Sequence, residues 1–207
     1  MEKSDLRNKM LKQRLLLSAE AMQEVQACVL EAIKQRSSFF AHKTVALYAD
    51  FRNEVPTKDL FHYLISIGSN VAYPKDYTIE ASSPEGPRDN VSKLHFFEVK
   101  ELEELKRSSF GLLEPKSFSL EMRPEDIDVF VVPGLVFDKR GYRIGYGAGC
   151  YDRFFSKLKT SSLRRKVFFL GLAYDFQILD RIHEEEHDIP VSTILTEKRW
   201  LNCQGVH

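Results

Sequence analysis

The sequence has 207 residues, 43% of them hydrophobic, which is enough for a substantial core in one large domain or two small ones. Thirty Lys and Arg side chains balance thirty Asp and Glu side chains, so the net charge excludes a general attraction to nucleic acid or anionic lipid. The cysteines form no CxxC pair, and no apolar run approaches the roughly 18 residues of a membrane span. We therefore expect a cytoplasmic monomer that binds neither nucleic acid nor a membrane.

A first helix is predicted over residues 4–16, with Leu6 and Met10 on one side. Another side of this helix carries three basic residues that fall near one another, Lys3, Arg7 and Arg14. From the pattern alone, a solvated basic face is the favoured interpretation.

Helices and strands then alternate along the chain. In order, we expect a helix capped by Ser18, a strand at 44–48, a helix at 57–67, strands at 70–73 and 93–99, a short helix at 101–107, an extended piece at 110–115, and strands at 127–132, 167–172 and 192–195. Such alternation predicts an α/β fold with three layers, in which helices cover both faces of a mainly parallel sheet. Ligands of such sheets bind beyond the carboxyl ends of the strands.

Four details of these elements can be tested against a structure. Helix 57–67 is expected to end at Gly68, and Pro74 is expected to stop the strand before it. Residues 75–92 are polar and predict a long surface loop, a candidate flap over a substrate. The residues of helix 57–67 that are expected to face inward are Leu60, Phe61, Leu64 and Ile65.

The most informative stretch follows the buried strand that ends at Val132. Four glycines fall within nine residues, at positions 141, 145, 147 and 149, and a helical pattern begins at Tyr151. A strand, a glycine loop and a helix N-terminus form an anion site. Arg143 and Arg153 add cationic donors and Asp152 adds a carboxylate, a combination that suits phosphate with magnesium. The alternative is a tight glycine turn without a ligand; the spacing matches neither a dinucleotide fingerprint nor a Walker loop.

This stretch resembles the signature of the 5-formyltetrahydrofolate cyclo-ligase family. The match runs without a gap over Pro133 to Asp138, Gly141, and Arg143 to Arg153, and weaker matches extend from the N-terminus to about Thr196. The resemblance therefore implies a single domain over 1–207. It implies conversion of 5-formyltetrahydrofolate, with or without a polyglutamate tail, to 5,10-methenyltetrahydrofolate, with ATP as co-substrate and Mg²⁺ as cofactor.

The resemblance also implies the roles of individual residues. Arg143 and Lys3 are the expected catalytic cations, and Asp152 and Asp188 are the expected magnesium ligands. The expected ATP-binding residues are Lys3, Ser4, Asp5, Leu6, Arg7, Arg143, Ile144, Gly145, Tyr146, Gly147, Ala148, Gly149, Cys150 and Tyr151. The expected substrate-binding residues are Arg7, Tyr48, Glu54, Tyr146, Gly147, Ala148, Gly149 and Cys150.

The sequence departs from the family pattern at three positions. Cys150 replaces a usual tyrosine, Ala148 stands where glycine or lysine is common, and Ser192 stands where a further aspartate is common. These departures keep a second hypothesis open, a non-catalytic protein of the same fold that binds nucleotide or folate.

A third hypothesis is a zinc hydrolase. Residues His183 to His187 formally match His-Glu-x-x-His, which needs a helix to place both imidazoles on one face. Pro190 follows closely and no convincing third ligand is present, so this is the weakest of the three hypotheses.

Overall fold

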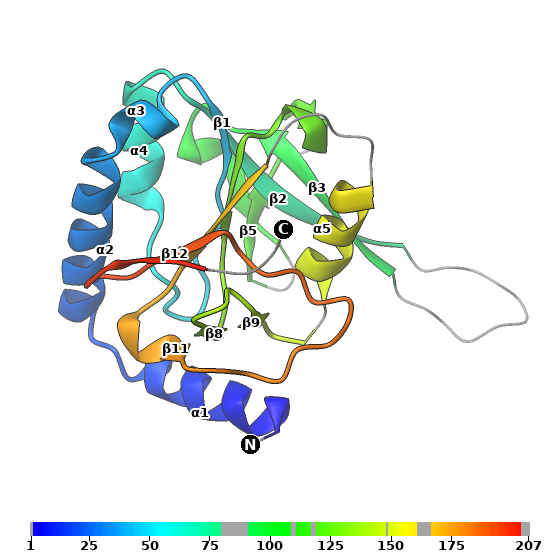
Figure 1. Ribbon diagram of the computed structural model, residues 1–207. Coiled ribbons are helices and arrows are strands. Elements are labelled where there is room, and N and C mark those ends of the chain that lie inside the picture. Colours follow the sequence, from blue (N-terminus) through cyan, green and yellow to red (C-terminus); the bar gives the residue numbers. More distant parts are fainter. Residues whose placement is uncertain are drawn as a thin grey trace, which may run out of the picture.

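The computed structural model describes residues 2–79, 91–108, 111–116, 119–147, 149–160 and 167–203. Within them the largest sheet has eight strands, and its central strands from β12 to β2 run parallel, with antiparallel strands at both edges (Figure 1). In spatial order the strands are β13 (Trp200–Asn202), β12 (Thr193–Leu195), β10 (Phe168–Leu172), β7 (Val129–Val132), β1 (Thr44–Ala46), β2 (Asn70–Ile79), β3 (Val91–Glu98) and β6 (Glu121–Met122).

The strand order reverses direction next to β1. The chain passes from β1 to β2 on one side, and later returns to place β7 and then β10 on the other side. The connections that leave the adjacent parallel strands β1 and β7 therefore run toward opposite sides of the sheet. Such a switch point opens a crevice beyond the carboxyl ends of the two strands, and it is where ligands of open α/β sheets bind.

Alternate residues of β7 pack against opposite faces of the sheet, as expected for a strand buried on both sides. Val129 and Val131 belong to a core cluster that includes residues of α2 (Ala19–Lys34) and α4 (Lys58–Ser66). Phe130 and Val132 belong to a second cluster, which includes residues of α5 (Cys150–Thr160). The three-layer α/β architecture predicted from the sequence is thus confirmed.

A smaller unit lies against one end of this sheet. It consists of α1 (Lys3–Leu15) and a second sheet in the order β11 (Ile178–Leu179), β8 (Val136–Asp138), β9 (Arg143–Ile144). The residues buried between them are Met10, Leu135, Val136, Ile144 and Ile182.

This smaller unit changes the expected picture of the glycine stretch, which is not one continuous loop. The chain first forms the β8–β9 hairpin, and only then reaches the loop before α5. Gly141 lies in the hairpin turn with φ +92°, where an added Cβ would sit 2.4 Å from the carbonyl oxygen of Val191. Its glycine is therefore explained by backbone conformation and crowding, without a ligand.

The expectation for residues 70–92 was partly wrong. Pro74 does not end the strand, since β2 continues to Ile79 and pairs with β3, while residues 80–90 of the expected flap lie outside the described residues. Beyond Ala72, β2 has lost its pairing with β1 and has β3 as its neighbour. A proline lacks only the backbone N–H donor, so a strand that is paired on one side can accommodate it where that N–H would have no partner.

Other boundaries also differ from the expectation. The helix expected at 101–107 is a 3₁₀ turn, η1 (Leu102–Glu104), followed by β4 (Leu105–Arg107), which pairs with β5 (Leu113–Pro115). The strand at 192–195 is not the final one, because β13 follows it. Among the helical elements, three short ones were not expected: α3 (Ser37–Phe40), η2 (Pro124–Asp126) and η3 (Asp175–Gln177).

Ser18 and Gly68 act as the sequence predicts, but Ile65 does not. The Ser18 hydroxyl accepts a hydrogen bond from the Ala21 N–H, and Gly68 has φ +76° after α4. Ile65 is 38% exposed, whereas the other three residues expected to face inward are buried. At 100° per residue Ile65 lies about 140° from Leu60, outside the arc that a helix turns toward a core.

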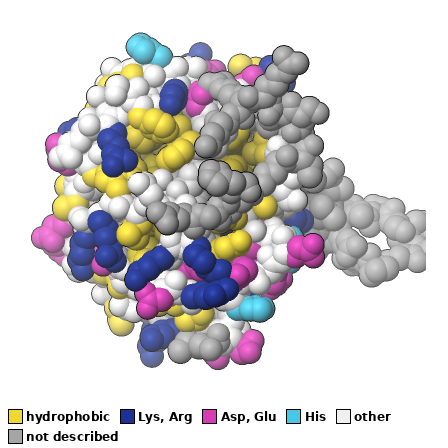
Figure 2. Space-filling view, viewed as in Figure 1, with side chains coloured by type: hydrophobic (Ala, Val, Ile, Leu, Met, Phe, Trp, Pro, Cys, Tyr) yellow, Lys and Arg dark blue, Asp and Glu magenta, His cyan; other side chains and the backbone are white. Residues whose placement is uncertain are grey.

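On the face seen in Figure 2, basic and acidic side chains are interspersed and do not form one large patch of a single charge. In the described part of the chain, every helix is too short or too polar to cross a membrane.

Candidate active site

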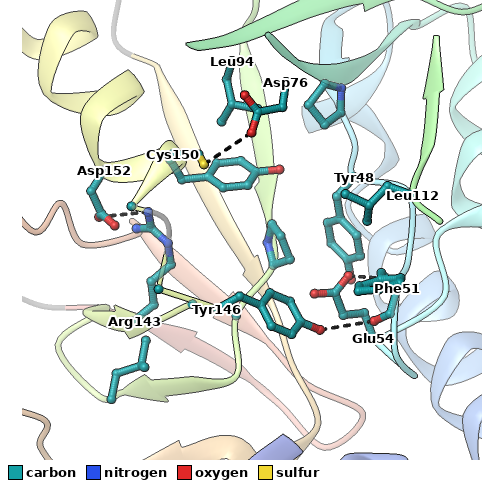
Figure 3. Close-up of a pocket in the computed structure, with 18 of the residues that line it drawn as sticks. Tyr48, Phe51, Glu54, Asp76, Leu94, Leu112, Arg143, Tyr146, Cys150 and Asp152 are labelled. Atoms are coloured by element: carbon teal, nitrogen blue, oxygen red, sulfur yellow. Dashed lines mark hydrogen bonds and ion pairs between the residues drawn. The ribbon is translucent and has the colours of Figure 1, made fainter. Parts of the chain in front are cut away.

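A cavity of about 690 Å³ opens at the switch point between β1 and β7. Its walls come from the start of α1, the loop after β1, the residues after β7, the segment from β9 into α5, and the segment after β11 (Figure 3). Fourteen of the residues expected to form the site line it: Lys3, Arg7, Tyr48, Glu54, Arg143, Ile144, Gly145, Tyr146, Gly147, Gly149, Cys150, Tyr151, Asp152 and Asp188.

Four residues of the expected site are not among the lining residues. Ser4 and Asp5 are exposed on the outer side of α1, and Leu6 packs against the cluster between α1 and the small sheet. Ala148 lies outside the described residues. On α1, therefore, Lys3 and Arg7 are the members of the expected set that reach the cavity, because residues 3 and 7 lie one helical turn apart.

Arg143 anchors one end of the cavity. It is only 6% exposed; its Nη2 donates to Asp152 Oδ1 at 2.9 Å and its Nη1 donates to the Ile189 carbonyl at 2.7 Å. Burial lowers the pKa of Arg143 and the Asp152 carboxylate opposes that change. The guanidinium stays charged, since arginine does not deprotonate in proteins. It therefore places a fixed positive charge beside the N-terminus of α5.

The start of α1 is tied to the same end of the cavity. Lys3 Nζ lies 2.8 Å from Glu185 Oε1 and 3.0 Å from Asp188 Oδ2, and Arg7 Nε donates to the Gly145 carbonyl at 3.1 Å. Partial burial would lower the pKa of Lys3, but its two acidic partners raise it, so the ammonium is charged. Gly147 lies against Arg7 with φ +110°, a backbone conformation that side chains rarely adopt.

Asp152 and Asp188 line the cavity from different segments. Asp152 Oδ1 accepts from Arg143 and from the Ile189 N–H at 3.3 Å, and Asp188 Oδ2 accepts from Lys3 and from the Glu185 N–H at 2.9 Å. Burial opposes ionisation of Asp188, yet these donors lower its pKa. Each carboxylate retains a second oxygen with no partner among the described residues.

The carboxylates of Asp152 and Asp188 could supply part of the ligand set of a magnesium ion. Magnesium is usually held by one or two carboxylates, together with water and substrate phosphates. The described residues contain no group of three or more metal-ligating side chains, so phosphates and water would complete the coordination. The donor set therefore suits an ion that arrives with a nucleotide.

The other end of the cavity is aromatic and contains a buried acid. Tyr48 donates its hydroxyl to the Val55 carbonyl at 2.7 Å, and the Tyr146 ring extends from the glycine segment toward Phe51 and Glu54 (Figure 3). Glu54 is 6% exposed and its Oε2 accepts the Phe51 N–H at 3.0 Å. Burial raises the pKa of Glu54 to about 7, while the Arg14 charge, with Nη2 at 3.8 Å from Oε1, opposes the rise.

Arg14 corrects the interpretation of the basic face on α1. This residue is 0% exposed rather than solvated. Its guanidinium donates to the carbonyls of Arg52 at 2.9 Å and Gly134 at 3.1 Å, and to the Tyr146 hydroxyl. A signal for this burial was present in the sequence, because Arg14 continues the stripe of Leu6 and Met10 at four-residue steps.

Several further lining residues come from segments without a local signal. The thiol of Cys150 donates to Asp76 Oδ2 at 3.7 Å. Leu94, Leu112 and Leu113 form an apolar wall from β3 and the residues at the start of β5. Their place depends on strand pairing far along the chain, which residue spacing does not reveal. Ser192, in contrast, lies outside the cavity lining, where its hydroxyl accepts the Phe169 N–H at 3.3 Å.

The segment with the zinc-like pattern is not helical. Residues 181–191 form an irregular stretch with a turn at 186–187, so His183 and His187 do not share a helix face. His187 instead lies 3.4 Å from Glu185 at the edge of the cavity.

Comparisons with known proteins agree on one family. The model of the 5-formyltetrahydrofolate cyclo-ligase family matches residues 1–197. A 5-formyltetrahydrofolate cyclo-ligase of Haemophilus influenzae is 29% identical over 202 residues, which span 94% of this chain and 97% of the relative. The one from Escherichia coli K12 is 28% identical over 190 residues, which span 90% of this chain and 96% of the relative.

Solved structures give the same result for the fold. The Aquifex aeolicus 5,10-methenyltetrahydrofolate synthetase superposes with a TM-score of 0.77 at 32% identity, covering 100% of this chain and 95% of its own. A 5,10-methenyltetrahydrofolate synthetase from Mycoplasma pneumoniae superposes with a TM-score of 0.71 at 24% identity, covering 95% of this chain and 99% of its own, and supports the fold alone.

Proposed function

The chain belongs to the 5-formyltetrahydrofolate cyclo-ligase family, and on this premise we propose that it converts 5-formyltetrahydrofolate to 5,10-methenyltetrahydrofolate with consumption of ATP. The observation that carries the proposal is a single cavity with two unlike ends. One end joins Lys3, Arg7 and Arg143 to a glycine segment, and the other is aromatic around Glu54. A triphosphate suits the first end and a pterin suits the second.

The reaction needs both ligands side by side. A formyl group on N5 is an amide, so its carbon is a poor electrophile and its oxygen is a poor leaving group. Transfer of the γ-phosphoryl group of ATP to that oxygen, with release of ADP, makes the carbon a better electrophile and the oxygen a better leaving group. The N10 amine then attacks the formyl carbon and loses its proton, and phosphate departs with the former formyl oxygen. Because the second step is intramolecular, orientation of the folate supplies much of the rate.

The proposed task of the protein is to position the two substrates and to balance charge. Arg143 and Lys3 would stabilise the negative charge that spreads over the transferred phosphoryl group. Backbone N–H groups of the glycine segment and the N-terminus of α5 would bind the remaining phosphate oxygens. Magnesium, held by Asp152 and Asp188, would neutralise phosphate charge when bound.

The pterin end would be formed by Tyr48, Tyr146 and Glu54. Two aromatic rings give a surface on which a flat heterocycle can stack. The Glu54 carboxyl would bind the N–H groups of the pterin, which is an interaction that a buried acid makes more strongly than an exposed one.

The test is a spectroscopic assay on the purified protein. Absorbance of the methenyl product should rise only when 5-formyltetrahydrofolate, ATP and magnesium are all present. An Arg143→Gln variant should lower kcat strongly, whereas Arg123→Gln, which removes an exposed ion pair with Asp126, should have wild-type activity.

Two results would contradict the proposal. Turnover without ATP would exclude the phosphorylation step. Ligand-dependent thermal stabilisation without any product, even at high protein concentration, would favour the non-catalytic nucleotide- or folate-binding protein instead.

A further inference from the structure

Of the residues that the structure describes, four lysine and arginine side chains line the cavity, and three of them, Lys3, Arg7 and Arg143, lie at the end that suits a triphosphate, here called the phosphate end. The fourth, Arg52, lies elsewhere and has no acidic partner among the described residues. Lys3 and Arg143 form ion pairs with carboxylates, and Arg7 donates to the Gly145 carbonyl on the glycine segment. Arg52 is exposed at the rim, and it forms no ion pair with any residue that the structure describes. A cation in this position is available to a ligand.

The backbone at Arg52 has an unusual conformation. The Glu54 N–H donates to the Phe51 carbonyl at 3.1 Å, which closes a tight turn, and the two central residues have φ 49° at Arg52 and φ 58° at Asn53. Positive φ at both central positions is the mark of a type I′ turn, which favours Gly, Asn and Asp. Asn53 fits that preference and Arg52 does not. Residues held against their preference gather at ligand sites.

Buried groups hold this turn in place. Arg14 Nε donates to the Arg52 carbonyl at 2.9 Å, and Asn53 Nδ2 donates to the Arg14 carbonyl at 3.2 Å. The Arg52 guanidinium lies 5.0 Å from the centre of the Phe51 ring and 5.7 Å from that of the Tyr146 ring. A cation that is already fixed over two rings loses little freedom when an anion binds it.

The surroundings of Arg52 determine which anion it fits. The three cations at the phosphate end already match a triphosphate, and Arg52 belongs instead to the aromatic end, on the turn that also carries Glu54. A ligand whose rings fill the aromatic end would reach the exposed rim with its last atoms. The planar guanidinium pairs with a carboxylate through two parallel hydrogen bonds.

We propose that Arg52 binds the carboxylates of the glutamate tail of the folate substrate and so selects substrates that carry this tail. The proposal rests on the proposed function, because it assumes a folate in the aromatic end. The exposure of Arg52 leaves the tail at the surface, so a longer polyglutamate chain can extend into solvent from the same point.

The experiment compares ligands with and without the tail. Dissociation constants would be measured for 5-formyltetrahydrofolate monoglutamate, for its triglutamate, and for 5-formyltetrahydropteroate, which has no glutamate. The wild type should bind the monoglutamate more tightly than the pteroate. Arg52→Gln should weaken binding of the monoglutamate about tenfold, as expected for loss of a charge-assisted hydrogen bond, and should leave the pteroate unchanged. Arg52→Lys should fall between the two.

A matched control is Arg36→Gln. Arg36 also lies over an aromatic ring, with its guanidinium carbon 4.1 Å from the centre of the Trp200 ring, but it does not line the cavity. This variant should bind all three ligands as the wild type does. The kcat of Arg52→Gln at saturating folate should equal that of the wild type, while KM for the monoglutamate rises.

Three outcomes would overturn the proposal. The first is that Arg52→Gln weakens binding of the pteroate as much as binding of the monoglutamate. The second is that the wild type binds these two ligands equally. The third is that Arg52→Gln raises KM for ATP rather than for folate. The last result would assign Arg52 to a phosphate. Tail-dependent folate binding without turnover would reject the catalytic function while it supports the role of Arg52, so the two failures are distinguishable.

Discussion

The protonation of Glu54 should influence stability near neutral pH. Burial raises its pKa from 4.5 to about 7, so the folded protein holds a proton that the unfolded chain has already lost. Between these two values the folded state binds more protons, and stability therefore decreases as pH rises. At about 1.4 kcal/mol for each pH unit, the decrease amounts to about 3 kcal/mol and is complete above pH 7.

We predict that Glu54→Gln removes this pH dependence. Glutamine keeps an oxygen that can accept the Phe51 N–H but has no charge to bury. The difference in unfolding free energy between variant and wild type should therefore shift in favour of the variant by up to about 3 kcal/mol from pH 5 to pH 8. Denaturant unfolding at a series of pH values measures it.

Glu185→Gln is the matched control for this prediction. Glu185 also lines the cavity, but the hydrogen bond from Lys3 lowers its pKa below the ordinary value. Both its folded and unfolded forms are therefore ionised over pH 5–8, and the difference from the wild type should be flat. A flat difference for Glu54→Gln as well would show that the Glu54 carboxyl is not desolvated.

For single residues, the sequence predicts which side chains lie near the cavity better than it predicts whether each of them is buried. Spacing made the glycine segment a candidate anion site, because that prediction follows from local geometry, whereas Arg7 was added to the site only by the resemblance to the family. The pattern assigned Arg14 to solvent, since the carbonyls that satisfy its guanidinium lie in loops after β1 and β7. The four-residue steps from Leu6 and Met10 point toward burial of Arg14, but a buried arginine is permitted only by partners such as these carbonyls, which a local pattern does not show.

At the scale of elements, one irregular segment carries much of the site. Residues 180–191 include Glu185 and Asp188, yet they form no helix or strand. The β8–β9 hairpin holds this segment through Arg140, which donates to the Ile182 carbonyl at 2.9 Å and pairs with Glu184 at 2.6 Å. Asp138, fully buried in the hairpin, accepts the Ile182 N–H at 3.2 Å.

We predict that Arg140→Gln loosens this segment without unfolding the sheet. Two carboxylates, Asp138 and Glu184, would lose their shared cation, and Asp138 is buried, so their mutual repulsion should push the segment outward. Amide hydrogen exchange should speed up over 182–189 and stay unchanged in β7 and β10. The magnesium concentration that gives half-maximal activity should rise several-fold, since Asp188 would be less well placed.

Arg123→Gln serves as the control for this prediction, because Arg123 forms an exposed ion pair with Asp126 away from the cavity. Exposed pairs contribute little to stability, so exchange in 182–189 should match the wild type. Equal exchange in the Arg140 and Arg123 variants would show that other contacts, such as the two bonds of Ile189, hold the segment.

The elements also show which parts of the fold were predictable. The strands of the parallel core can be predicted from short apolar β-branched runs, and the helices can be predicted from the helical period of their apolar residues. The β8–β9 hairpin was missed because its residues also read as a glycine loop, and its turn is fixed by contact with Val191, about fifty residues later in the chain. Likewise β2 continues through Pro74, where β3 is its partner and β1 no longer pairs with it, and this arrangement is not visible in the local sequence.

For the molecule as a whole, the cavity lies between two units of unequal size. The large sheet is covered by α2 and α4 on one face and by α5 on the other, whereas α1 rests on the small sheet through one cluster around Met10. Lys3 and Arg7 line the cavity from α1, so the proposed binding of a triphosphate beside them would require α1 to be docked. Stability need not be uniform across such a structure, and the smaller unit should open first.

We predict that Met10→Ala weakens nucleotide binding more than an equally destabilising change in the large core. Removing a buried methionine side chain costs about 2–5 kcal/mol, and here the loss falls on the docking of α1. If α1 is undocked in part of the population, the apparent Kd for ADP rises in inverse proportion to the docked fraction. We expect an increase of about three- to tenfold, and faster hydrogen exchange over residues 3–15.

Ile33→Ala provides the comparison, because Ile33 is fully buried in the core cluster between α2 and the large sheet and is not one of the residues that line the cavity. It should lose a similar free energy of unfolding, measured by denaturant titration, and yet bind ADP as the wild type does at temperatures where both variants are folded. Equal ADP affinity in the two variants would mean that α1 and the large sheet unfold as one cooperative unit. A selective loss in Met10→Ala would instead establish that the phosphate end is assembled by docking of the N-terminal helix, and that nucleotide in turn stabilises that helix by the same free energy.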